Sequence, residues 1–214
     1  VQLDKTIFYP EGGGQPGDIG WMIRAAGSEM PIVDTQYHSS EGLIHLMGEV
    51  GSLPFIGEEI QLRIDWDRRY RLMRMHSCMH MLCSVVPASV TGGSIRDGQG
   101  RLDFDLPETI DKVHLSERLN EVIRLNSEMT LEWITEESLA AQPELVRTMS
   151  VKPPAGTGTI RLVKFSGIDL QPCGGTHVAA TGEIGRVRIK KVEKKGRQNR
   201  RVIVVFDDDG DLSS

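Results

Sequence analysis

Hydrophobic residues in the first 65 positions occur in short runs that Gly, Pro, Asp and Ser clusters separate at intervals of about ten residues. The apolar runs lie at residues 21–25, 32–35, 43–50 and 59–64. Many short strands at such spacing are typical of a small barrel or sandwich. We therefore predict a first domain over residues 1–65, a small N-terminal β-barrel that contains a glycine-rich motif.

The pattern changes to a helical period at residue 65. Leu72, Met75, Met79 and Leu82 recur every three or four positions, and Pro87 ends the pattern, so a helix is predicted over residues 65–86. Beyond it, the sequence predicts a turn at 91–93, a strand at 102–106, a helix at 115–123, strands at 131–135 and 160–165, a loop at 153–158, and a hairpin of 187–192 with 201–206. We predict a second domain, residues 66–214, with an α+β fold and a mostly antiparallel sheet.

Composition is that of an ordinary globular protein. Of 214 residues, 39% are hydrophobic and 26% are charged. No apolar run approaches the ~20 residues that a membrane span needs, and no signal peptide is visible, so no membrane partner is expected. Three cysteines, an odd number, argue against a disulfide framework and favour a cytoplasmic location.

The net charge of −5 conceals a basic segment. Residues 185–201 contain nine Lys and Arg residues and one Glu, a local charge of +8. Such a patch on an acidic protein can bind phosphate groups locally. A solvated hairpin rich in lysine explains the composition equally well.

Two short motifs carry candidate metal ligands. His76 and His80 are four residues apart on the predicted helix, so they share one face. Cys173 and His177 flank Gly174, Gly175 and Thr176, and the glycines allow a tight turn between the two ligands. Three imidazoles and one thiolate make a complete tetrahedral set, so the predicted cofactor is Zn²⁺.

Neighbouring residues disfavour two kinds of zinc enzyme. A metalloprotease has Glu directly after the first histidine, where this chain has Ser77. A nucleobase deaminase has H-x-E and P-C-x-x-C, but Cys78 and Thr176 stand at the diagnostic positions. Four protein ligands are typical of structural zinc, whereas catalytic zinc keeps one position open. The sequence leaves both roles open.

Residues 12–14 are three consecutive glycines, followed by Gln15. Glycines expose backbone N–H groups and let a ligand approach closely. A tight turn is the alternative, which the following Pro-Gly-Asp sequence supports. No Gly-Lys-Ser/Thr follows, so this is not a phosphate loop.

Together, Phe8-Tyr9-x-x-Gly-Gly-Gly-Gln15, His76-x3-His80, Cys173-Gly-Gly-Thr-His177 and Thr181-Gly-Glu-Ile-Gly185 resemble the editing module of alanyl-tRNA synthetases. They resemble still more the free-standing AlaX alanyl-tRNA editing proteins of the medium-length type, over nearly the whole chain. The last two motifs are also shared with the threonyl-tRNA synthetase editing module.

The resemblance implies a β-barrel followed by a zinc-binding editing domain like the second additional domain of these synthetases. It implies a hydrolase that removes serine, and also glycine, from mischarged tRNA for alanine. The metal ligands would be His76, His80, Cys173 and His177. The substrate-binding residues would be Thr6, Gly12, Gly13, Gly14, Gln15 and Thr176. The tRNA contacts would be Lys190, Lys191, Lys194, Lys195, Arg197 and Arg200.

Three alternatives remain open at this point. They are a non-catalytic RNA-binding module with a structural zinc, a zinc hydrolase acting on a small metabolite, and an editing enzyme with threonyl-type specificity. DNA is not an expected partner, no catalytic residue beyond the zinc site is identified, and the sequence does not fix the oligomeric state. The bulkier Cys78 and Met79 between the two histidines depart from the usual small residues and bear on pocket shape.

Overall fold

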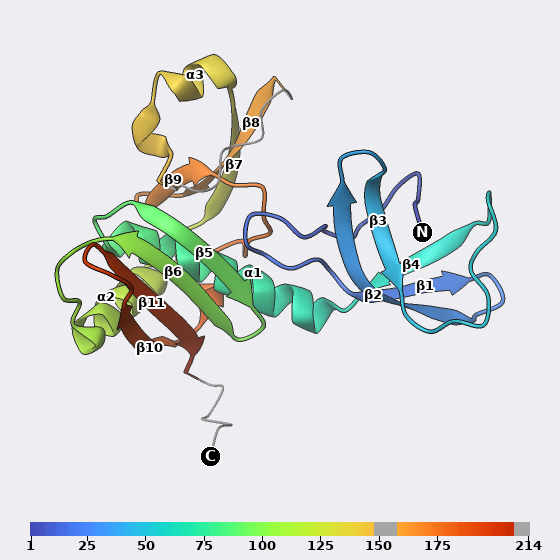
Figure 1. The fold of residues 1–214 in the computed structure, drawn as a ribbon, viewed down its shortest axis with the longest axis horizontal. Coiled ribbons are helices and arrows are strands. Elements are labelled where there is room, and N and C mark those ends of the chain that lie inside the picture. The colour runs from blue at the N-terminus through green and yellow to red at the C-terminus, as the bar shows by residue number, and fades with distance from the viewer. Residues whose placement is uncertain (148–157, 208–214) are drawn as a thin grey trace. The chain divides into compact units, whose positions relative to one another are not determined.

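A computed structural model describes residues 1–147 and 158–207. The chain divides into two compact units, Val1–Tyr70 and Arg71–Ser214. Figure 1 labels the helices and strands of both units. Residues 153–157 of the predicted loop lie outside the described residues.

The first unit contains one antiparallel sheet with the strand order β3-β2-β1-β4. Its strands are β1 (Gly20–Arg24), β2 (Glu29–His38), β3 (Gly42–Met47) and β4 (Ile60–Ile64). The four predicted strands are therefore confirmed, with shifted ends. Phe8, Met22, Met30 and Ile32 form the buried core of this unit.

The predicted barrel is not shown, because the sheet is open. Strands β3 and β4 are its two edges, and no pairing among the described residues joins them. Closing a barrel requires enough tilted, staggered strands to surround a core of side chains. Here only four strands of five to ten residues pair. The sequence spacing marks strands and turns, but it does not encode whether the edge strands meet.

The second unit contains two sheets and most of the helical structure. One sheet has the order β10-β11-β6-β5 and the other has the order β7-β8-β9. The strands are β5 (Val90–Arg96), β6 (Gln99–Asp105), β7 (Met129–Thr135), β8 (Thr159–Phe165), β9 (Asp169–Pro172), β10 (Val187–Lys194) and β11 (Asn199–Phe206). The helices are α1 (Trp66–Val85), which begins in the first unit, α2 (Lys112–Arg124) and α3 (Glu136–Ala140), with 3₁₀ segments η1 (Pro143–Leu145) and η2 (Thr181–Ile184). All described strand pairs are antiparallel, so the α+β prediction is confirmed.

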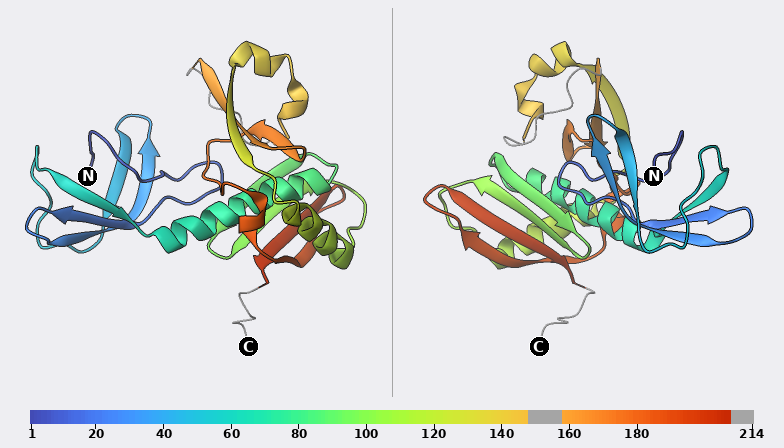
Figure 2. Two further views of the ribbon diagram at one scale, coloured as in Figure 1. Left: turned by 180° about the vertical axis from the view of Figure 1, so that it is seen from behind. Right: turned by 45° about the vertical axis from the view of Figure 1, so that its right-hand side comes forward.

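Helix α1 is buried on more than one side over its second half. Leu72, Met75, Met79 and Leu82, the residues that predicted it, are all in the core. Helices α1 and α2 lie on the same face of the β10-β11-β6-β5 sheet (Figure 2). Gly100 of β6 lets that sheet approach closely, because a Cβ there would lie 2.6 Å from the Met79 methyl carbon and 2.8 Å from the Met75 sulfur. This close packing fixes the helix that carries both predicted histidine ligands.

Two local predictions differ from the structure. Gly92 and Gly93, the expected turn, lie within β5, where a bulge between Val90 and Gly92 accommodates them. Strand β9 has no counterpart in the sequence prediction, because four residues are too few to show a period. No helix in the described part of the chain is long and apolar enough to cross a membrane.

The Thr181–Ile184 segment precedes β10 in the chain and is hydrogen-bonded to the end of α2. The Thr181 hydroxyl donates to the carbonyl of Ile123 at 3.0 Å and accepts from the amide of Ser127 at 3.0 Å. A Cβ at Gly182 would lie 2.3 Å from the side-chain oxygen of Asn126, so a larger residue would displace that side chain. This sequence motif therefore has a structural role in the fold.

Candidate metal centre

The structure brings His76, His80, Cys173 and His177 into one group. The histidines of the first motif lie on α1, and the other two residues lie in the loop that follows β9. One potential ligand atom from each residue lies within 4.8 Å of all the others. The Cys173 sulfur is 3.4 Å from Nε2 of His76 and 3.3 Å from Nε2 of His177. These donors fit a metal ion that prefers nitrogen and sulfur, as Zn²⁺ does.

Asp169 orients one of these histidines. Nδ1 of His80 donates to the Asp169 carboxylate at 2.7 Å, and the Gln171 amide donates to the same oxygen at 2.9 Å. Because Nδ1 is engaged, Nε2 is the ring atom that faces the group. Burial favours the neutral ring, but Asp169 and the nearby Cys173 sulfur outweigh it and raise the pKa of His80 to about 9. A metal ion would displace the Nε2 proton.

Ser77 lies beside a second histidine. Its hydroxyl oxygen is 3.4 Å from Nδ1 of His177 and accepts the amide of Val178 at 3.1 Å. Burial, together with the charge of His76, lowers the pKa of His177 to about 3, so this ring is neutral. Ser77, which stands where a metalloprotease has Glu, thus helps to position a ligand.

Cys173 has the properties of a thiolate ligand. Burial opposes its ionisation, but the surrounding histidines, His76 first, hold the pKa of the thiol well below its usual value. Cys78 and Cys83 differ, because burial raises the pKa of each thiol to about 12. Only the cysteine of the Cys-Gly-Gly-Thr-His motif is therefore suited to bind a metal.

Arg161 holds the loop that carries Cys173. Its Nε donates to the carbonyl of Cys173 at 2.8 Å, and Nη2 donates to the carbonyl of Gly175. Thr176, the predicted substrate contact in this loop, is half-buried beside His177. The arginine stabilises the tight turn that the two glycines permit.

Three residues around the group escaped the sequence analysis: Asp169, Gln171 and Arg161. A signal for two of them was present. Asp169 and Gln171 precede Cys173 by four and two positions, so alternation along a strand places all three on one face. Polar residues repeated at that spacing before a ligand indicate supporting contacts. Arg161 gave no comparable signal, since its partners are backbone carbonyls.

The glycine-rich motif belongs to the first unit and forms a two-residue turn. Gly12 and Gln15 exchange both backbone hydrogen bonds at 3.0 Å, with Gly13 and Gly14 at φ of 59° and 82° between them. Positive φ at both central positions is the geometry that favours glycine in tight hairpins. The turn interpretation is therefore confirmed. The two central glycines remain exposed, whereas Gln15 is fully buried.

Thr6 also lies in the first unit, within reach of a buried histidine. Its hydroxyl is 2.8 Å from Nε2 of His45 and accepts the amide of Phe8 at 3.1 Å. Nδ1 of His45 is 3.3 Å from the carbonyl of Val1, which can only accept, so Nδ1 carries the proton. Burial lowers the pKa of His45, which favours the neutral ring. Thr6 therefore donates to Nε2, and its hydroxyl keeps one acceptor site.

The basic residues predicted to contact tRNA are not equivalent. All of them except Arg200 are exposed. Lys191 and Lys195 form ion pairs with the carboxylate of Glu193 at 2.6 and 3.0 Å, and Lys190, Lys194 and Arg197 do not. Arg200 is 6% exposed. Its guanidinium donates to the carbonyls of Pro107, Glu108, Gly196 and Asn199. These bonds give Arg200 a structural role, and the proposed phosphate-binding residues do not include it.

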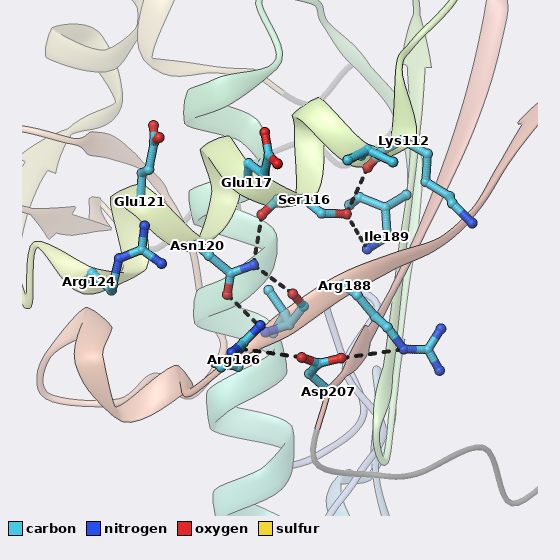
Figure 3. A pocket seen from close by; sticks show the side chains of 12 residues that line it. Lys112, Ser116, Glu117, Asn120, Glu121, Arg124, Arg186, Arg188, Ile189 and Asp207 are labelled. Carbon is cyan, nitrogen blue, oxygen red and sulfur yellow. Dashed lines mark hydrogen bonds and ion pairs between the residues drawn. The ribbon is translucent and has the colours of Figure 1, made fainter.

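A groove of about 490 Å³ lies between α2 and the start of β10 (Figure 3). Asn120 spans it, because its amide donates to the carbonyl and accepts from the amide of Val187. Arg186 and Arg188 share Asp207 at 3.4 and 3.7 Å. Its lining includes none of the predicted site residues. The groove is thus lined by residues that hold α2 against β10, and two of its arginines share one carboxylate.

Comparisons with known proteins show which proteins this chain is similar to. Residues 160–203 match the threonyl and alanyl tRNA synthetase second additional domain, and residues 1–68 match the class II (A) tRNA synthetases. The alanyl-tRNA editing protein AlaX-M of Saccharolobus solfataricus is 34% identical, over 94% of this chain and 86% of the relative. AlaX-L of Pyrococcus horikoshii is 33% identical, over 94% of this chain and 50% of its own length. The alanine–tRNA ligase of Methanobrevibacter smithii is 32% identical, over 90% of this chain and 22% of the ligase.

The matches cover both units, and they include the segment that carries Cys173 and His177. The first relative is similar along most of its own length as well as along most of this chain. The ligase, in contrast, is matched over only about a fifth of its length. The chain belongs to the AlaX family of alanyl-tRNA editing proteins.

Proposed function

We propose that this protein is a trans-editing hydrolase that removes serine, and also glycine, from mischarged tRNA for alanine. The observation that carries the proposal is similarity to alanyl-tRNA editing proteins over 94% of the chain, combined with the convergent group of His76, His80, Cys173 and His177. Family membership makes the chain a hydrolase of mischarged tRNA. Which amino acid is removed and which metal is bound are proposals that go beyond family membership.

We propose Zn²⁺ as the metal that these four residues would hold. The donor set, a thiolate and three imidazoles, suits zinc better than the oxygen-preferring Mg²⁺ or Ca²⁺. When bound, zinc would supply a local positive charge that favours a developing oxyanion. The protein's own contribution is rigidity: Asp169 fixes the ring of His80, and Arg161 fixes the loop of Cys173.

Selection of serine is assigned to Thr6. The Thr6 hydroxyl donates to His45, so toward a substrate it can act only as an acceptor. A seryl hydroxyl can donate to it, whereas the methyl group of alanine cannot. A polar group left without a partner costs binding energy, so the correct product, alanyl-tRNA, is bound more weakly. Glycine has no hydroxyl either, so its acceptance would depend on a route other than the hydrogen bond to Thr6.

Binding of the tRNA backbone is assigned to the exposed basic residues of the β10–β11 hairpin. Lys190, Lys194 and Arg197 offer charges that no described carboxylate pairs within 4.0 Å. Such groups bind phosphates without reading sequence. The terminal ester would then be held by the editing site while the hairpin holds the backbone.

The proposal is tested by single-turnover deacylation of seryl-tRNA for alanine with the wild type, the metal-stripped protein and Cys173→Ala. We expect the last two to lose activity, and zinc to restore the stripped wild type only. Cys83→Ala is the matched control, because Cys83 is buried but is not in the metal group. Binding of tRNA without turnover would identify a non-catalytic RNA-binding module. Preferential hydrolysis of seryl-tRNA for threonine would identify threonyl-type editing.

A further inference from the structure

An exposed tryptophan lies on the same sheet as the metal group. Trp133 of β7 pairs with Arg161 of β8, and the amide of Cys173 donates to the carbonyl of Arg161 at 3.2 Å. Residues directly opposite each other in an antiparallel sheet share one face. Trp133, Arg161 and Cys173 therefore form one row across the three strands, with the tryptophan at the free edge and the metal ligand at the other end.

The next row shows how burial changes along this face. It consists of Leu131, Val163 and Gln171. Val163 and Gln171 are buried, whereas Leu131 is 39% exposed and Trp133 is 58% exposed. The face thus passes from a buried end, where Gln171 supports His80, to an apolar and solvent-exposed end on β7. Two strand spacings of ~4.8 Å place the backbone of Trp133 about 10 Å from that of Cys173 across the sheet.

We propose that Trp133, with Leu131 beside it, forms a stacking surface for the base of the 3′-terminal nucleotide of the bound RNA. This inference rests on the proposed function, since it takes an aminoacyl ester to be the ligand of the site. In such an ester only one ribose ring separates the carbonyl from the terminal base. When the ester lies at the metal group, the terminal base therefore lies about as far from Cys173 as Trp133 does.

The chemistry of the surface fits a base better than a protein. Aromatic side chains bind unpaired bases by stacking, which any base can do through its π-face. A stable protein interface needs about 800 Å² on each partner, far more than one tryptophan and one leucine supply. Arg161 keeps the row in register, because its guanidinium is bonded to the loop that carries Cys173.

Three substrates test the proposal with the full-length protein loaded with zinc: seryl-tRNA for alanine, 3′-O-seryladenosine and serine ethyl ester. For the first two, Trp133→Ala should lower kcat/KM by about 5-fold to about 150-fold, the range for loss of one stacked base. Trp133→Phe should retain most of the activity. The ethyl ester has no base, so all variants should hydrolyse it at the wild-type rate. Trp66→Ala is the matched control, because Trp66 is also 58% exposed.

Two kinetic outcomes would overturn the stacking surface: no loss on seryladenosine, or an equal loss on all three esters. A second measurement is independent of turnover. In a Trp21→Phe/Trp66→Phe background, Trp133 is the sole tryptophan, and adenosine monophosphate should quench its fluorescence. Absence of quenching overturns the proposal, as does a dimer that Trp133→Ala dissociates. Quenching without deacylation by the wild type would retain base stacking and reject the proposed function.

Discussion

Asp169 accepts a hydrogen bond from Nδ1 of His80 at 2.7 Å, and its side chain is fully buried. The carboxylate lies on β9, two strands from the β7 edge, and the histidine lies on α1. A buried carboxylate that fixes the ring of a metal-ligating histidine raises the basicity of the ligand and sets its tautomer. The pair therefore links the sheet to the helix through the candidate metal centre.

Replacing this carboxylate should weaken metal binding. We expect Asp169→Asn to lower zinc affinity by about 10-fold to 100-fold, the usual effect of losing a carboxylate that is hydrogen-bonded to a metal-ligating histidine. Competition with a chromophoric chelator measures the affinity. Asp97→Asn is a suitable control, because Asp97 is half-exposed, pairs with Arg71 and is not in the group. An affinity equal to that of the wild type would exclude the assigned role of Asp169.

The three cysteines should differ sharply in reactivity. In folded, metal-stripped protein at neutral pH, iodoacetamide should alkylate Cys173, whose thiol pKa is lowered by the surrounding histidines. Cys78 and Cys83 should remain unmodified, because burial raises the pKa of each to about 12. Peptide mass spectrometry locates the label, and added zinc should protect Cys173. Equal labelling of all three would show that the assigned environments are wrong.

Thr6 should control the choice between serine and alanine. Thr6→Val keeps the shape but removes the acceptor, so we expect seryl-tRNA hydrolysis to fall about tenfold, equivalent to ~1.4 kcal/mol. The slow hydrolysis of alanyl-tRNA should change little. Thr130→Val serves as control, because Thr130 is exposed and lies in the second unit. A parallel loss on both substrates would mean that Thr6 supports the fold and does not select.

The basic hairpin should act on tRNA and not on small esters. We expect Lys190→Ala/Lys194→Ala/Arg197→Ala to raise KM for seryl-tRNA and to reduce the salt dependence of kcat/KM, by a slope of about 0.9 for each phosphate that the variant no longer binds. Hydrolysis of seryladenosine should be unchanged. Arg200→Ala should instead lower the melting temperature, because it removes a buried side chain together with its hydrogen bonds to the carbonyls of Glu108 and Asn199. Unchanged salt dependence in the triple variant would place the RNA elsewhere.

Elements with a clear hydrophobic period were predictable from the sequence, whereas the pairing of strands distant in the chain was not. Leu72, Met75, Met79 and Leu82 predicted α1 because a buried helix needs apolar residues at that spacing. Thr135 is of a residue type that favours the helix N-cap, and its hydroxyl accepts the amide of Ser138 at the start of α3 at 3.1 Å. Strand β9 and the open edges of the first sheet depend on long-range pairing, which leaves no local period.

The same division applies to the candidate site. The two motifs of metal ligands were visible because their spacing is set by one helix and one glycine turn. Asp169 and Arg161 were not, because their roles arise only when β8 and β9 pair beside α1. The basic composition of residues 185–201 did not reveal that Arg200 points inward, although Arg200 alternates along β11 with the buried Val202 and Val204.

The most direct measurement compares deacylation rates of seryl-tRNA and alanyl-tRNA for alanine under single-turnover conditions with zinc-loaded wild type. We expect the seryl ester to be hydrolysed at least tenfold faster, about 1.4 kcal/mol, because only serine can donate a hydrogen bond to Thr6. Equal rates on the two esters, or hydrolysis of neither, would be incompatible with an editing enzyme that protects alanyl-tRNA.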